Sequence, residues 1–93
     1  MFMKKSVRVY ITGTVQGVFY RMFVKQNAER HNVKGFVRNL NDGRVEIFLE
    51  GDSERVNKLI ELSKVGPKHS QIRKVEIKPE RFQSFKVFKV LHI

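Results

Sequence analysis

GTVQGVFYR, residues 13–21, constrains the fold most strongly, because it joins an alternating apolar run to a helical pattern. Apolar residues alternate with polar or aromatic ones over residues 7–12, a period of two that predicts a half-buried strand. Over residues 20–28 they recur every four positions, which predicts a helix of about three turns. A strand-to-helix turn of this kind directs backbone N–H groups and the positive end of the helix dipole at one point. Because Arg21 adds a forked cation that can bind two oxygens at once, the stretch predicts a cradle for an oxyanion such as phosphate.

Turn and cap residues delimit the remaining elements. NDG at residues 41–43 is typical of a tight hairpin. Asp52 or Ser53 is the expected N-cap of a second helix, and Gly66-Pro67 is expected to end it. The apolar residues at the start of the fourth strand are out of phase, which predicts an irregularity there. The predicted strands cover residues 7–12, 33–40, 45–50, 72–78 and 85–91. The first predicted helix carries its apolar stripe over residues 20–28 and fades at His31-Asn32.

This order is β-α-β-β-α-β with one additional C-terminal strand, and it predicts an α+β protein of ferredoxin-like architecture. Two helices would cover one face of an antiparallel sheet, and residues 1–93 would form a single domain. On the third strand, Glu46, Phe48 and Glu50 alternate with apolar residues, so we expect them on the outward, solvent-facing side.

The chain is strongly basic, with 19 Lys and Arg against 9 Asp and Glu and a formal net charge of +10. Such a balance favours anionic partners, whether nucleic acid, an acidic membrane surface or a small phosphorylated substrate. The basic residues are scattered, so charge alone does not choose among these partners. The absence of cysteine excludes disulfides, thiolate metal sites and a cysteine nucleophile. Because no apolar stretch forms a signal peptide or spans a bilayer, we expect a soluble protein of the cytoplasm.

The predicted topology brings a second polar side chain to the oxyanion cradle. The first two strands are joined by a helix and therefore run parallel, so their C-terminal ends lie at the same edge of the sheet. The cradle follows the first strand, and Asn39 lies at the end of the second. We therefore expect the Asn39 amide to lie near Arg21.

Two separated motifs resemble those of the acylphosphatase family. They read G-x-V-Q-G-V-x-x-R over residues 13–21 and G-F-V-x-N-L-x-D-G over residues 35–43. The resemblance continues at Glu50-Gly51 and at G-P-x-x-S over residues 66–70, so it covers nearly the whole chain. Tyr20 stands where the family usually has phenylalanine, and a buried tyrosine hydroxyl needs a hydrogen-bond partner.

The resemblance implies a hydrolase that cleaves the carboxyl–phosphate bond of acyl phosphates to a carboxylate and inorganic phosphate, without metal or cofactor. It implies that Arg21 and the preceding loop amides bind the phosphate and that Asn39 orients the attacking water. The implied partner is a small acyl phosphate, with a phosphate or sulfate ion able to occupy the loop, and the enzyme is expected to be a monomer. The amides so assigned are those of Gln16, Gly17, Val18, Phe19 and Tyr20.

These few residues suffice for the implied reaction. The leaving group is a carboxylate, whose conjugate acid has a pKa of about 4, so it departs without a general acid. Phosphoryl transfer depends mainly on positioning and on electrostatic stabilisation of the phosphoryl oxygens. Asparagine is a poor base, so the water loses its proton late or with assistance from the substrate, and the sequence leaves both routes open.

Two other functions suit the same topology and charge. RNA-recognition domains stack bases on exposed aromatic residues of the first and third strands, and Tyr10 and Phe48 are the corresponding pair here. Glu46 and Glu50 flank Phe48 and would repel a phosphate backbone, which argues against nucleic acid. A catalytically silent domain that keeps an anion pocket is the second alternative. For the Gln16 side chain we expect a structural role, bonding the loop or facing solvent.

Overall fold

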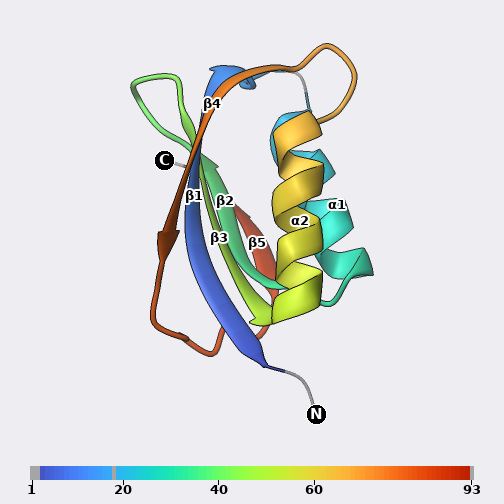
Figure 1. Ribbon diagram of the computed structural model, residues 1–93. Coiled ribbons are helices and arrows are strands. Elements are labelled where there is room, and N and C mark those ends of the chain that lie inside the picture. The colour runs from blue at the N-terminus through green and yellow to red at the C-terminus, as the bar shows by residue number, and fades with distance from the viewer. Residues whose placement is uncertain (1–2, 18, 93) are drawn as a thin grey trace.

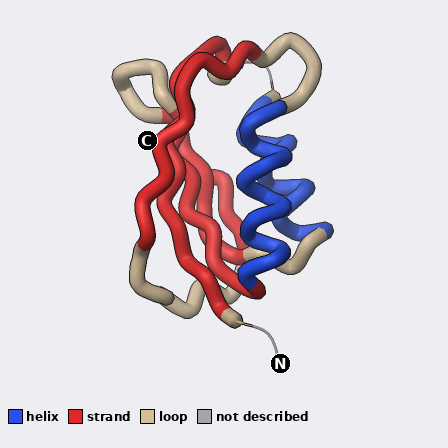
Figure 2. The backbone as a smooth tube through the Cα atoms, in the orientation of Figure 1, coloured by secondary structure: helices blue, strands red, loops and turns tan. Residues whose placement is uncertain are grey.

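Within the residues that the computed structural model describes, 3–17 and 19–92, five strands form one sheet and two helices pack against one of its faces (Figures 1 and 2). The β-α-β-β-α-β order with an additional strand is confirmed, as is the ferredoxin-like arrangement. The elements are β1 (Lys4–Thr14), α1 (Tyr20–Arg30), β2 (Lys34–Asn39), β3 (Val45–Asp52), α2 (Ser53–Val65), β4 (Gln71–Pro79) and β5 (Phe88–Leu91).

The strands lie in the order β4-β1-β3-β2-β5. The first four strands pair antiparallel, whereas β5 pairs parallel to β2, so the additional strand makes the sheet mixed. The irregularity predicted at the start of β4 is present, because the register between β1 and β4 shifts between Thr12 and Gly13.

The predicted stop and start signals act as expected. The Asp52 carboxylate caps α2 by accepting a hydrogen bond from the Glu54 amide, and α2 ends at Gly66, whose φ is 71°. In the hairpin between β2 and β3, the Leu40 amide donates to the Arg44 carbonyl over 2.8 Å. These local contacts fix where each element begins and ends.

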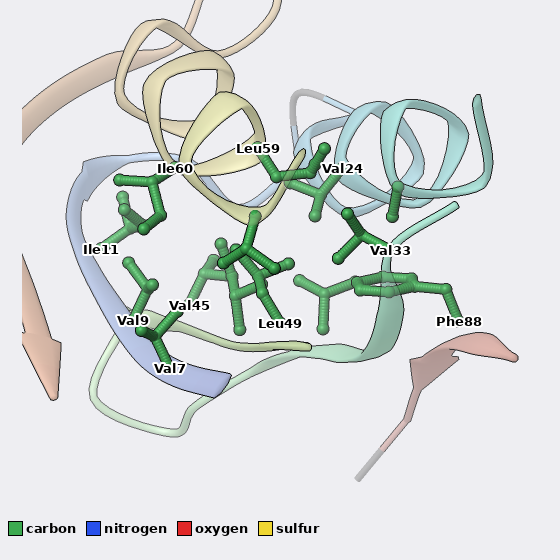
Figure 3. Close-up of a cluster of buried hydrophobic side chains, with 14 of the residues drawn as sticks. Val7, Val9, Ile11, Val24, Val33, Val45, Leu49, Leu59, Ile60 and Phe88 are labelled. Carbon is green, nitrogen blue, oxygen red and sulfur yellow. The ribbon is translucent and has the colours of Figure 1, made fainter. Parts of the chain in front are cut away.

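The hydrophobic core lies between the sheet and the two helices (Figure 3). The predicted inner stripes of both helices are buried, with Tyr20, Val24 and Ala28 on α1 and Val56, Leu59, Ile60 and Ser63 on α2. They meet the inward side chains of the strands, which include Val7, Val9, Ile11, Val37, Val45, Ile47 and Leu49.

The opposite face of the sheet is covered by the chain that connects β4 to β5, so the expectation of a solvent-facing surface on β3 is wrong. Phe48 and Glu50 are fully buried. The Glu50 carboxylate accepts hydrogen bonds from the amides of Gln83, over 2.7 Å, and Phe85. The Phe85 ring packs on Phe48 with 5.2 Å between the ring centres. Because the Phe85 amide is used in this way, the last strand begins at Phe88 and not at residue 85 as predicted.

Glu46 is the centre of an ionic cluster on the same face. It accepts hydrogen bonds from Arg8 over 2.6 Å, from Tyr10 over 3.2 Å and from Arg38. Burial by itself would raise the pKa of Glu46, but the hydrogen bonds from Arg38 and Arg8 outweigh it and hold that pKa below its ordinary value. Tyr10 is therefore engaged by Glu46 while Phe48 is buried, so this pair cannot stack nucleotide bases.

Candidate active site

The candidate site lies at the end of the sheet toward which the C-termini of β1, β2 and β5 all point (Figure 1). These strands run in one direction, since β1 and β2 are both antiparallel to β3 and β5 is parallel to β2. A pocket of about 620 Å³ opens at this end, and both Arg21 and Asn39 line it. The expectation that the topology carries Asn39 to Arg21 is therefore met.

The N-terminus of α1 borders this pocket and carries no cap of its own. Its N-cap residue, Phe19, makes no side-chain hydrogen bond to the helix, and the first turn contains no acidic residue. In contrast, α2 has the Asp52 cap and an acidic residue, Glu54, in its first turn. The first amides of a helix have no partner within the helix. Among the residues that the structure describes, no side chain caps those of α1, so α1 presents donors and the positive end of its dipole to the pocket.

Two described residues of the loop that leads into α1 have a positive φ. Gly17 has a φ of 79°, and Phe19 lies in the left-handed region with φ 61° and ψ 22°. Left-handed residues turn neighbouring N–H groups toward one side of the chain, as in anion-binding nests. A Cβ at Gly17 would lie in open space, so a side chain would meet no steric clash there. The positive φ of Gly17 is therefore what favours glycine at this position.

Two side chains anchor this loop to the rest of the fold. The Gln16 amide donates to the carbonyls of Leu40 and Arg44, each over 3.0 Å, which ties the loop to the β2–β3 hairpin and confirms a structural role for Gln16. The Tyr20 hydroxyl donates to the Ser63 carbonyl of α2 over 2.7 Å, which is the partner that a buried tyrosine needs. Burial raises the pKa of Tyr20 well above its ordinary value, so this hydroxyl remains a donor.

Arg21 is held by the C-terminal residues on one side of its guanidinium. Its Nη1 donates to the Leu91 carbonyl over 3.2 Å and lies 3.4 Å from His92 Nδ1. A guanidinium has five N–H donors. Within the described part of the chain the others make no hydrogen bond, so they are available to a ligand in the pocket.

Asn39 ends β2 with an unused acceptor. Its Oδ1 is buried and has no hydrogen-bond partner among the described residues. A buried carbonyl oxygen without a partner is costly, so it is usually explained by a bound water or ion or by a catalytic role. In this pocket it can accept a hydrogen bond from a bound water.

Most of the predicted site residues line the pocket: Gly17, Phe19, Tyr20, Arg21 and Asn39. Gln16 does not line it and acts through its anchored side chain, while the predicted Val18 lies outside the described residues. The sequence missed a second wall, because the parallel pairing of β5 with β2 was not predicted. This wall and the adjoining turn of α1 contribute Met22, Lys25, Phe88, Lys89, Val90 and His92.

Among the residues that the structure describes, no three His, Asp or Glu side chains lie close enough together to hold a metal ion. In the same described ranges, neither helix has the length and apolar character needed to cross a lipid bilayer.

Comparisons with known proteins all point to one family. The family model described as Acylphosphatase matches residues 7–90, a range that contains the loop, Arg21 and Asn39. The chain is 42% identical to an acylphosphatase of Syntrophus aciditrophicus, over 97% of this chain and 95% of that protein. It is 47% identical to an acylphosphatase of Rubrobacter xylanophilus, over 82% of this chain and 69% of that protein. The crystal structure of acylphosphatase from Bacillus subtilis is similar with a TM-score of 0.90 and 31% identity, covering 96% of this chain and 99% of that one. The chain therefore belongs to the acylphosphatase family.

Proposed function

We propose that this chain, as an acylphosphatase, hydrolyses the carboxyl–phosphate bond by direct attack of one water on phosphorus. Arg21 and the loop amides hold the phosphoryl group, and Asn39 orients the water. Three features found among the described residues carry the proposal, because they converge on one pocket. They are a helix N-terminus without a side-chain cap, an arginine with unused donors and a buried amide oxygen without a protein partner.

Phosphate binding follows from the arrangement around Arg21. A cation in the first turn of a helix opposes the helix dipole, at a cost of about 0.3–1 kcal/mol. An anion bound between the guanidinium and the amides of Gly17, Phe19 and Tyr20 removes this repulsion, because the helix N-terminus and Arg21 then both face negative charge. The bond from Arg21 to the Leu91 carbonyl fixes one edge of the guanidinium and leaves the rest to bind two phosphoryl oxygens.

Rate enhancement follows from the same contacts. Negative charge on the phosphoryl oxygens is stabilised by donors that are already in place, so little reorganisation is needed during the reaction. The Asn39 Oδ1 accepts a hydrogen bond from the attacking water and restricts its orientation. The carboxylate product leaves unprotonated, and the proton of the water passes to the substrate phosphate or to solvent.

A direct test measures hydrolysis of benzoyl phosphate by the change in ultraviolet absorbance, with EDTA present and with p-nitrophenyl phosphate as a phosphate-monoester control. We expect turnover of the acyl phosphate and none of the monoester, which has a poorer leaving group. Arg21→Ala should lower kcat/KM by at least about 10²-fold, because it removes the principal charged donor.

The matched control is Arg30→Ala, at the far end of the same helix, where the side chain is exposed. It should retain wild-type kcat/KM. Equal losses in both variants, or full activity of Arg21→Ala, would contradict the role of Arg21. All the proposed groups come from one chain, so we also expect a monomer by light scattering at the assay concentration.

A further inference from the structure

We propose that Phe19 and Met22 form the acyl-group subsite of this enzyme, and that they favour acyl phosphates whose acyl group is aromatic or extended and apolar. The inference rests on the proposed function, because it concerns the acyl group, which is joined to the phosphoryl group by the bond that is cleaved.

Both side chains are exposed beside the phosphate cradle. Phe19 is 84% exposed and Met22 is 47% exposed, and both line the pocket that contains Arg21 and Asn39. Phe19 is the N-cap of α1, so the two residues are three positions apart and neighbours on one side of the helix. A phosphoryl group bound at Arg21 would place its acyl substituent within reach of these two side chains.

The conformation of Phe19 gives an independent reason. Its φ of 61° places a bulky residue in the left-handed region, which is strained for any side chain with a Cβ and favours glycine. Glycine would give the loop the same backbone path without this strain. Because its ring is so exposed, the ring contributes little to folding that could offset the strain. A contact made only when substrate is bound would account for phenylalanine here.

The other wall of the pocket is apolar as well. Phe88 is buried in the core and Val90 packs against it, so both face the helices. Side chains alternate along a strand, so Lys89 projects to the opposite face of the sheet, where it is in register with Phe36. Lys25 pairs with Glu29 along α1, with 3.6 Å between Nζ and Oε2. Lys25 and Lys89 also line the pocket, but the apolar side chains of Phe88 and Val90 lie on the same wall. Together with Phe19 and Met22 they offer an apolar acyl group contacts on both sides of the pocket.

The test compares kcat/KM for benzoyl, acetyl and succinyl phosphate. Wild type should prefer benzoyl phosphate, and Phe19→Ala should lower the benzoyl-to-acetyl ratio of kcat/KM by about 10-fold, as expected for loss of one aromatic contact. Met22→Ala should lower the ratio in the same direction. Phe19→Leu, which restores an apolar side chain, should recover part of it. Inhibition by inorganic phosphate should be unchanged in Met22→Ala, because Met22 lies outside the loop whose amides are proposed to hold the phosphate.

The matched control is Phe82→Ala, which removes an exposed phenylalanine, 43% accessible, from the connection between β4 and β5. It should leave the ratio unchanged. An equal loss on both substrates in Phe19→Ala, an unchanged ratio, or a wild-type preference for succinyl phosphate would each overturn the subsite while leaving the hydrolase assignment intact. Failure of the wild type to hydrolyse any acyl phosphate would overturn the proposed function, and the subsite with it.

Discussion

Asn39→Ala is expected to separate activity from stability. The Oδ1 of Asn39 accepts no hydrogen bond from another residue in the described part of the chain, so its removal leaves no protein donor unpaired. Alanine removes only the packing contacts of a short, half-buried side chain. We therefore expect the free energy of unfolding to stay within about 1 kcal/mol of wild type or to rise.

The catalytic rate of Asn39→Ala, in contrast, should fall. Without the amide, the attacking water keeps its place in the pocket but loses its orientation, and misplacement of a reacting group costs about 10²-fold in rate. The loss should fall on kcat. KM should change less than about threefold, because the phosphate contacts of Arg21 and the loop amides are untouched.

The assay pairs benzoyl phosphate kinetics with urea unfolding of the same preparations. Asn41→Ala is the matched control, since Asn41 is an exposed asparagine two residues further along, in the hairpin. It should behave as wild type in both measurements. Full kcat in Asn39→Ala would refute water positioning, and a loss of about 3 kcal/mol or more in its stability would show that Asn39 is chiefly structural.

Three further predictions concern the scaffold. Tyr20→Phe should lower the free energy of unfolding by about 1–2 kcal/mol, because it leaves the Ser63 carbonyl without its buried donor; an unchanged urea midpoint would contradict this. The lowered pKa of Glu46 means that the unfolded chain binds more protons in acid, so stability should hold at neutral pH and fall as the pH drops below about 4.3. Glu46→Gln should flatten that acid dependence in urea titrations between pH 3 and 7, and an unaltered slope would exclude Glu46 as its source. Gly35→Ala would place a Cβ 1.8 Å from the Phe48 carbonyl oxygen, so we expect a loss of more than about 3 kcal/mol, and near-native thermal stability would contradict the close approach.

Local signals carried most of the fold prediction. The cap at Asp52, the stop at Gly66 and the two apolar periodicities each depend on residues close together in the chain, so they could be read without tertiary information. The approach of Asn39 to Arg21 followed from connectivity alone, because a helical crossover forces parallel strands.

The predictions that were wrong or missing concern contacts between residues that are far apart in the sequence. Glu50 appeared solvent-facing because its strand alternates, yet its carboxylate binds amides more than 30 positions later, at Gln83 and Phe85. Nothing near Glu50 in the sequence signals this partner. The parallel pairing of β5 with β2 was missed for the same reason, and with it the pocket wall formed by Phe88 and Val90.

The most direct test is a crystal structure of the protein with inorganic phosphate. We predict one phosphate bound between the guanidinium of Arg21 and the amides that open α1, with the Asn39 amide within hydrogen-bond distance of a water beside it. A phosphate bound elsewhere, with Arg21 still directed only at the Leu91 carbonyl, would contradict the proposed site.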